Sequence, residues 1–177
     1  AGEAFDKVGR MLQLPYPGGP EIEKHARGGD PKAYAFPRAV LKDAPFNFSF
    51  SGLKTAVLYQ LQKIDDPQAH LADICASFQA AVIDALVKKT IRAAKEYGHS
   101  LITLSGGVAC NPTLQESLTT PAENAGIKVQ LSPPALTTDN AGMIAFAALL
   151  AAENRTADDL NIGINPNLSL ASQMKNP

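Results

Sequence analysis

The 177-residue sequence predicts an α/β fold, and three observations support that prediction. Residues 101–104 alternate branched aliphatic residues with Thr, as a buried strand does, and a Gly-Gly turn follows before a helix begins. A second short strand at 129–131 and a second apolar helix at 139–154 repeat this order. Residues 68–97 carry apolar side chains at helical spacing, which predicts a long central helix. Alternating strands and helices favour parallel strands joined by right-handed crossovers.

The first 66 residues predict helices with a short β insertion. The Pro- and Gly-rich run at 15–20 breaks the helical pattern, and Ser51 is the expected N-cap of a later helix. The elements expected here are helices at 1–14, 21–26 and 53–63 and short strands at 34–37 and 46–50. The sequence therefore divides into this region, an α/β core at 67–160 and a loose tail at 161–177.

The last helix is strongly apolar, so we expect it to be packed. Thr137 or Thr138 is the expected N-cap of this helix. Its spacing predicts a buried face, made of Met143, Ile144, Ala147 and Leu150.

Composition indicates an ordinary soluble protein. The net charge is −1 and no block of basic residues appears, so any RNA contact must come from a local patch or from a partner. Cys75 and Cys110 form no CxxC pair and are expected to be reduced thiols. No apolar run approaches the roughly 20 residues of a membrane span, and no signal peptide is evident. We therefore expect a cytoplasmic protein without a membrane segment.

The Gly106-Gly107 turn is the leading candidate for a ligand site. Adjacent glycines let a ligand approach the backbone, and Asn111 is positioned to cap the following helix, whose free N–H groups favour an anion. Ligands of parallel sheets bind beyond the carboxyl ends of the strands. Residues 138–140 follow another such end, so they should lie beside the glycines. The alternative is a tight turn before a packed helix.

Three acidic residues are further candidates. Asp139 lies at the start of a predicted helix. It is either a carboxylate of a metal or phosphate site or an acid that interacts favourably with the helix dipole. Asp6 and Glu23 flank the turn at 15–20, either as acceptors for ribose hydroxyls or as solvated helix acids. The three histidines have no metal-ligand spacing, and no Ser/His/Asp or Cys/His arrangement suggests nucleophilic catalysis.

Six ordered motifs resemble one family. They are GEAFDK at 2–7, PYPGGP at 15–20, FSFSGLKT at 48–55, ASFQ at 76–79, GGVACN at 106–111 and TDNA at 138–141. Together they resemble the universal tRNA threonylcarbamoyladenosine transferase family, whose older label is O-sialoglycoprotein endopeptidase or glycoprotease. The resemblance extends to about residue 165 and implies part of an actin-like, sugar-kinase-like ATPase lobe with a helical insertion and a mixed sheet.

The resemblance also implies a function and a set of site residues. The reaction moves a threonylcarbamoyl group from its adenylate to an adenosine near the tRNA anticodon. The expected ligands are ATP or the adenylate, with iron or zinc as the divalent metal. Asp139 would be a metal ligand. The nucleotide-binding residues implied are Asp6, Gly19, Glu23, Gly106, Gly107 and Asn111. The expected partners are tRNA and a paralogous subunit of the same fold.

The sequence departs from the family at its start. It begins after the family's H-x-x-x-H metal motif, so we expect a C-terminal portion that is inactive alone and binds no metal by itself. A cut sheet would leave an unpaired edge and an apolar face, which predicts self-association. Two alternatives stay open: a glycoprotein metallopeptidase, which lacks its usual zinc motif here, and a non-catalytic nucleotide-binding interaction module.

Overall fold

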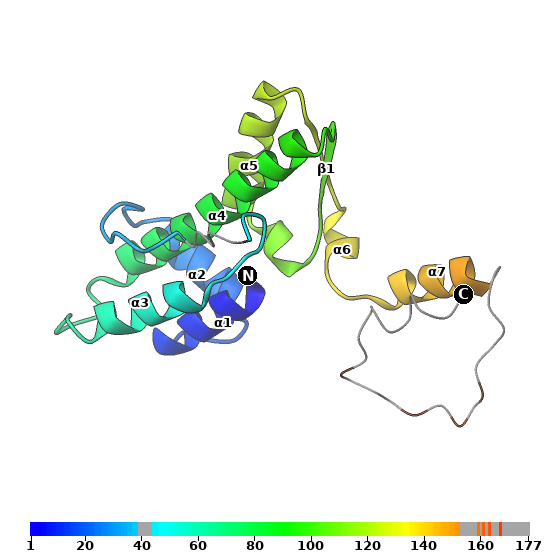
Figure 1. Cartoon of the computed structure of the whole chain (residues 1–177). Coiled ribbons are helices and arrows are strands. Elements are labelled where there is room, and N and C mark those ends of the chain that lie inside the picture. The colour runs from blue at the N-terminus through cyan, green and yellow to red at the C-terminus, as the bar shows by residue number, and fades with distance from the viewer. Residues whose placement is uncertain (39–43, 153–158, 160, 162, 164–166, 168–177) are drawn as a thin grey trace. The chain divides into compact units, whose positions relative to one another are not determined.

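The computed structural model describes residues 1–38, 44–152, 159, 161, 163 and 167 (Figure 1). Its elements are α1 (Gly2–Met11), α2 (Gly18–Ala26), α3 (Ser51–Leu61), α4 (Leu71–Glu96), β1 (Leu101–Leu104), the 3-10 turn η1 (Gly107–Cys110), α5 (Pro112–Asn124), β2 (Lys128–Leu131), α6 (Pro134–Thr137) and α7 (Ala141–Ala152). The chain forms two compact units, Ala1–Asp139 and Asn140–Pro177. The structure is thus α/β and mostly helical, whereas the actin-like architecture stays a prediction.

The first core forms where α1, α2 and α3 pack around the N-terminal half of α4 (Figure 1). Phe5 and Phe78 meet edge to face at its centre, with ring centroids 5.2 Å apart. Ile22 and Ile74 are fully buried beside them. The apolar positions of α4 that predicted a central helix therefore do bury, and they hold α1 and α2 together.

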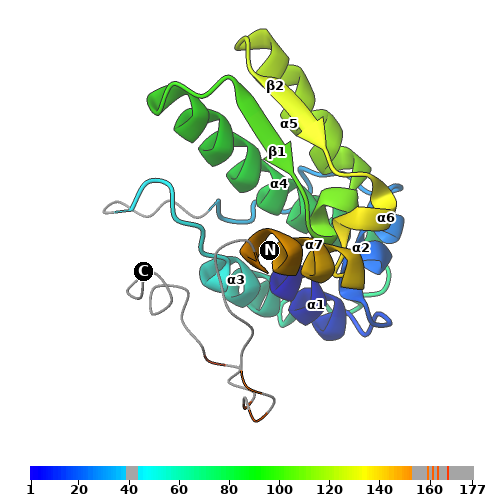
Figure 2. The same ribbon diagram turned by 90° about the vertical axis from the view of Figure 1, so that its right-hand side faces the viewer.

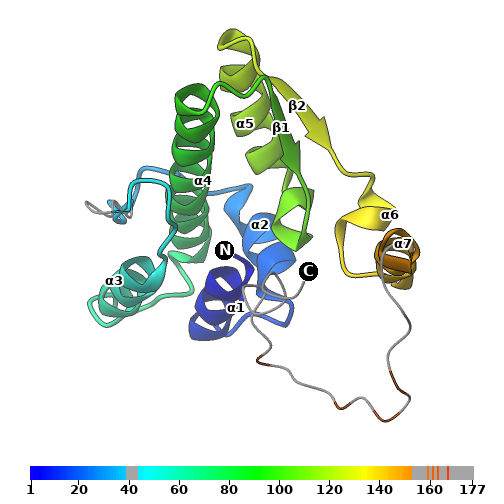
Figure 3. The ribbon, with the colours of Figure 1, turned by 45° about the vertical axis from the view of Figure 1, so that its right-hand side comes forward.

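The second core lies between the sheet and two helices. β1 and β2 pair in parallel, with Ile102 opposite Val129. These two side chains face α4 and α5, which cover the same side of the sheet (Figures 2 and 3). The opposite side exposes Leu101, Thr103, Lys128 and Gln130. Among the described residues the sheet is therefore parallel rather than mixed, and its outer face is more polar than expected.

The predicted strands at 34–37 and 46–50 are wrong. Both stretches are irregular, and each packs against side chains of α4 instead of pairing with another strand. The Tyr34 N–H donates to Ser77 Oγ at 3.1 Å. The Phe46 ring lies 5.4 Å from that of Tyr97. The alternation of Phe with polar residues at 46–50 thus indicates a partly buried segment, but this segment has no partner strand among the described residues.

Two helix predictions also need correction. Ser51 is the first residue of α3, Phe50 is the N-cap, and no side chain caps this end. The helix predicted at 139–154 begins later, at Ala141, where the Met143 N–H donates to Asn140 Oδ1 at 2.9 Å. None of the residues of α7 is buried, so the predicted buried face is wrong for Met143, Ile144, Ala147 and Leu150. Because α7 is apolar on every side, its sequence alone selects no buried face.

Within the described ranges, no helix is both long and apolar enough to cross a bilayer.

Candidate functional site

A close contact between α1 and α2 brings the first two candidate acids together. The Gly18 N–H donates to Asp6 Oδ1 at 2.9 Å, so Asp6 satisfies a free donor at the start of α2. A Cβ atom at Gly18 would lie 2.7 Å from the Phe5 carbonyl oxygen, closer than real Cβ atoms come. Glycine is therefore required here for the two helices to approach. Glu23 lies one turn further along α2 and accepts from Arg27 Nη2 at 2.9 Å.

The Gly-Gly turn lies at the carboxyl end of β1, as predicted. Gly106 has a φ of 90°, a left-handed conformation that favours glycine. Its N–H donates to the Thr137 carbonyl at 2.9 Å, which fixes the turn against the chain that follows β2. Residue 138 and Gly107 line one pocket, so the predicted neighbourhood of these two strand ends is confirmed for them.

Both polar atoms of the Asn111 side-chain amide form hydrogen bonds within the protein. Its Oδ1 accepts from the Leu114 N–H at 3.0 Å, so the predicted N-cap of α5 is confirmed. Its Nδ2 donates to Gln79 Oε1 at 2.7 Å, and both side chains are buried. This bond ties the Gly-Gly turn to α4. The sequence did not single out Gln79, although it ends the ASFQ motif.

These elements enclose a pocket of about 350 Å³ that gathers most of the predicted nucleotide residues. Its lining comprises Gly2, Phe5, Asp6, Pro17, Gly19, Pro20, Glu23, Gly107, Val108, Cys110, Asn111 and Thr138. Gly106 directly precedes Gly107, and Asp139 directly follows Thr138. The pocket therefore combines two carboxylates with a bare backbone turn, within the size range of small-ligand sites.

The described residues do not fit a metal centre. They contain no group of three or more His, Cys, Asp or Glu side chains able to hold an ion. Asp139 is exposed, and no described His or acid joins it in such a group. A single carboxylate is an insufficient donor set, so no chemical step here is assigned to a metal.

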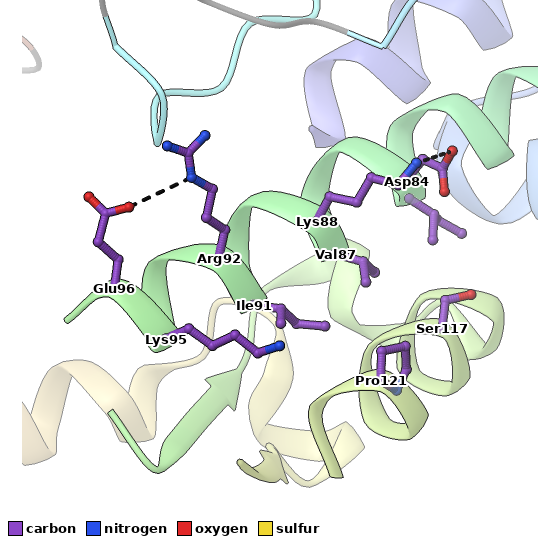
Figure 4. Close-up of a pocket in the computed structure, with 10 residues that line it drawn as sticks. Asp84, Val87, Lys88, Ile91, Arg92, Lys95, Glu96, Ser117 and Pro121 are labelled. Atoms are coloured by element: carbon purple, nitrogen blue, oxygen red, sulfur yellow. Dashed lines mark hydrogen bonds and ion pairs between the residues drawn. The ribbon is translucent and has the colours of Figure 1, made fainter. Parts of the chain in front are cut away.

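A larger hollow of about 820 Å³ lies elsewhere, between α4 and α5 (Figure 4). Val87, Ile91 and Lys95 point toward α5, whereas Arg92 and Glu96 point away from it. None of the predicted site residues lines this groove. Long, exposed side chains border it, so its volume describes an open surface and not an enclosed site.

The two thiols have different environments. Cys75 is fully buried in the first core, and burial raises the pKa of its thiol to about 12. Cys110 is exposed and lines the pocket. Cys75 is therefore an unreactive core residue, whereas chemical modification of Cys110 can be used to detect changes at the pocket.

An ion-paired cluster lies beside the pocket. Lys7 Nζ lies 2.6 Å from Glu3 Oε1, and Lys54 Nζ lies 3.4 Å from the same atom. Hydrogen bonding to Lys7 and the nearby Lys54 charge lower the pKa of Glu3. The pKa of Lys7 is raised in turn by Glu3. Lys54 is thus paired with a carboxylate.

This fold and pocket define an α/β protein with a pocket of small-ligand size where two helices meet a glycine turn. The sequence model of the family described as tRNA N6-adenosine threonylcarbamoyltransferase (TsaD) matches residues 1–146. The chain belongs to this family.

Curated relatives carry the same description. A protein of Thermosipho africanus is 47% identical over 170 residues, covering 96% of this chain and 52% of the relative. One of Geobacter sulfurreducens is 53% identical over 146 residues, covering 82% and 43%. One of Thermotoga neapolitana is 48% identical over 170 residues, covering 96% and 51%. The chain thus spans about half the length of these relatives.

Proposed function

We propose that this chain is the nucleotide-binding portion of a tRNA threonylcarbamoyladenosine transferase. The transferase moves a threonylcarbamoyl group from its adenylate to an adenosine near the tRNA anticodon. The observation that supports this most is the shared pocket of Asp6, Gly19, Glu23, Gly107 and Asn111, in a chain of a family named for that reaction. A cytoplasmic location and a paralogous partner subunit are part of the same proposal.

The two acids would hold the ribose. Asp6 uses Oδ1 for the Gly18 N–H, and Glu23 uses Oε1 for Arg27, so each carboxylate keeps a second oxygen as an acceptor. In other nucleotide-binding folds, ribose hydroxyls donate hydrogen bonds to carboxylates. The α1–α2 contact fixes both acids, so the sugar would be oriented before the group transfer.

The Gly-Gly turn would support the rest of the nucleotide. A Cβ atom at Gly107 would meet nothing within 4 Å, which leaves room for a ligand against the backbone. The Asn111–Gln79 bond holds this turn relative to α4. In this proposal the described residues bind and orient the donor, and no proton transfer is assigned to them.

Equilibrium dialysis of the chain with ATP tests this proposal. We expect saturable binding that Asp6→Ala and Glu23→Ala each weaken about tenfold or more, since each loses a charge-assisted hydrogen bond. Asp66→Ala, on an exposed turn, is the matched control and should bind as the wild type does. Equal affinity in all four proteins would contradict the assignment.

A second experiment separates the transferase from the other two readings. The N-terminal half of a relative is supplied with the chain, and threonylcarbamoyl transfer to tRNA is measured. Restored transfer supports the proposal, whereas nucleotide binding without transfer favours a non-catalytic interaction module. Peptide-bond hydrolysis in the same mixture would instead favour the metallopeptidase.

A further inference from the structure

The C-terminal half of α4 presents a basic and aromatic surface far from the nucleotide pocket. The residues that make up this surface are Lys88, Lys89, Arg92, Lys95, Phe46, Phe48 and Tyr97, which we call the α4 basic surface. Four cations gather between residues 84 and 96, against two acids, in a chain whose net charge is −1. We propose that the α4 basic surface binds the tRNA substrate, an inference that rests on the proposed function.

Three of the four cations start from one row of positions along α4, although their side chains diverge, with Lys95 pointing toward α5 and Arg92 away from it (Figure 4). Lys88, Arg92 and Lys95 are spaced four and three residues apart, which places them in one row along α4. Lys88 and Arg92 are 72% and 61% exposed. Such a row of accessible cations matches the regularly spaced phosphates of a nucleic-acid backbone.

The acids nearby do not cancel this charge. Asp84 pairs with Lys88 at 3.3 Å and also with Arg38, while Glu96 pairs with Arg92 at 3.7 Å (Figure 4). Exposed pairs of this kind contribute little, so phosphates can replace the carboxylates at small cost. Lys95 is exposed and has no ion-pair partner among the described residues.

Two aromatic rings lie beneath two of these cations. Lys89 Nζ is 5.6 Å from the centre of the Phe48 ring, and Arg92 Cζ is 5.5 Å from that of Phe46. Tyr97 is 64% exposed at the end of the helix. Aromatic rings next to cations can contact unstacked bases as well as phosphates, as in proteins that bind single-stranded RNA. An acidic protein segment would pair with the cations, but its carboxylates would have no favourable contact with the aromatic rings.

The spacing suits a long ligand. Gln79, which anchors the pocket through Asn111, lies 16 residues before Lys95 on the same helix. At 1.5 Å per residue this is about 24 Å. A small substrate cannot span that separation, whereas a tRNA whose target adenosine reaches the donor at the pocket can also contact this part of α4.

Fluorescence anisotropy with labelled tRNA tests this inference on the full 177-residue chain. Lys89→Glu, Arg92→Glu and Lys95→Glu together should weaken binding at least tenfold and lower the salt-dependence slope by about 2. The matched control is Lys24→Glu, Lys32→Glu and Lys63→Glu, which makes the same charge change at exposed sites elsewhere. Equal loss in both triple variants would overturn the inference, because net charge alone would then explain it.

Two milder variants keep the test valid if the triple variant misfolds. Lys88→Gln with Lys95→Gln changes only exposed side chains and should weaken tRNA binding several-fold. Tyr97→Ala should weaken it about fivefold or more, whereas Tyr59→Ala, at a similarly exposed ring on α3, should not. Unchanged binding in both α4 variants would contradict the proposal.

Two further readouts separate this inference from its alternatives. Poly-glutamate that displaces tRNA as well as unlabelled tRNA does would overturn the RNA assignment in favour of an acidic protein partner. ATP affinity should be unchanged in every α4 variant. A wild-type chain that binds tRNA but not ATP would contradict the proposed function and leave this surface supported.

Discussion

Asn111 shows how one side chain serves both the fold and the site. Its amide caps α5 through Oδ1 and reaches Gln79 through Nδ2, so it fixes the Gly-Gly turn relative to α4. Both side chains are buried, and a buried partner left without its bond is costly. The geometry of the pocket therefore depends on the Asn111–Gln79 hydrogen bond. The sequence predicts the helix cap made by Asn111 but not Gln79 as its second partner.

Asn111→Ala should lower the free energy of unfolding by about 2–4 kcal/mol, through the lost cap and the orphaned Gln79 amide. Urea denaturation measures this change. Asn124→Ala, at the exposed end of α5, is the control and should change stability by less than about 0.5 kcal/mol. A loss of the same size in both variants would contradict the role given to the buried bond.

The two cysteines make a second prediction at this scale. Iodoacetamide should modify Cys110 in the native chain and spare Cys75, whose pKa of about 12 keeps it a thiol. Bound ATP should protect Cys110, because it lines the pocket. Mass spectrometry of the labelled peptides gives both results, and labelling of Cys110 that ignores saturating ATP would count against the pocket.

Burial of Cys75 also predicts a pH dependence. Its pKa is raised in the folded chain, so an unfolded chain ionises this thiol first, near its ordinary pKa of 9.0. The stabilising contribution is therefore full below about pH 9 and is lost as the pH rises toward 12. Cys75→Ala should flatten this part of the stability curve, and an unchanged alkaline decline would contradict the assignment.

At the scale of elements, the contact between α1 and α2 decides whether the acids meet. A methyl group at Gly18 would collide with the backbone of α1, 2.7 Å from the Phe5 carbonyl oxygen and 2.8 Å from Asp6 Cα. A methyl group at Gly19, which lines the pocket, would make only an ordinary 4.0 Å contact with Phe5 Cβ. The helix contact therefore requires glycine at position 18, whereas Gly19 lines the pocket without a close contact.

Gly18→Ala should destabilise the chain by about 1–3 kcal/mol and weaken ATP binding, because the helices must separate. Gly19→Ala should keep stability within about 1 kcal/mol and weaken ATP binding alone. Thermal unfolding and dialysis on the two variants give the comparison. The opposite pattern, with Gly19→Ala the less stable variant, would show that the helix contact is wrongly described.

Local patterns predicted elements best where one face of an element is buried. The α4 spacing and the 101–111 strand-turn-helix unit were predictable because periodicity, Gly conformation and capping agree there. Residues 46–50 show the failure: alternating Phe residues indicate one buried side but not a partner strand. The α7 sequence fails differently, since an all-apolar helix has no periodic signal. The positions of Asp6 and Glu23 in one pocket depend on tertiary packing that spacing alone does not show.

At the scale of the whole molecule, two features predict self-association. β1 and β2 each have one paired neighbour among the described residues, which leaves free edges. α7 exposes Met143, Ile144, Phe146, Leu149 and Leu150. A large apolar surface of this kind favours association in water.

Light scattering should show the apparent mass rising with concentration. Ile144→Lys with Leu149→Lys should reduce association if α7 mediates it, whereas Leu58→Lys on α3 is a control at a similarly apolar exposed site. Association that persists in the α7 variant would assign it to the sheet edges. A monomer at every concentration would contradict the prediction.

The central claim is that Asp6, Glu23 and the Gly-Gly turn form one adenylate pocket. Backbone amide NMR of the chain titrated with ATP tests it most directly, because it reports each residue separately. The account predicts saturable shifts at Gly19, Gly107 and Val108, with none along the α4–α5 groove. Shifts confined to the groove, or scattered over unconnected surfaces, would contradict it.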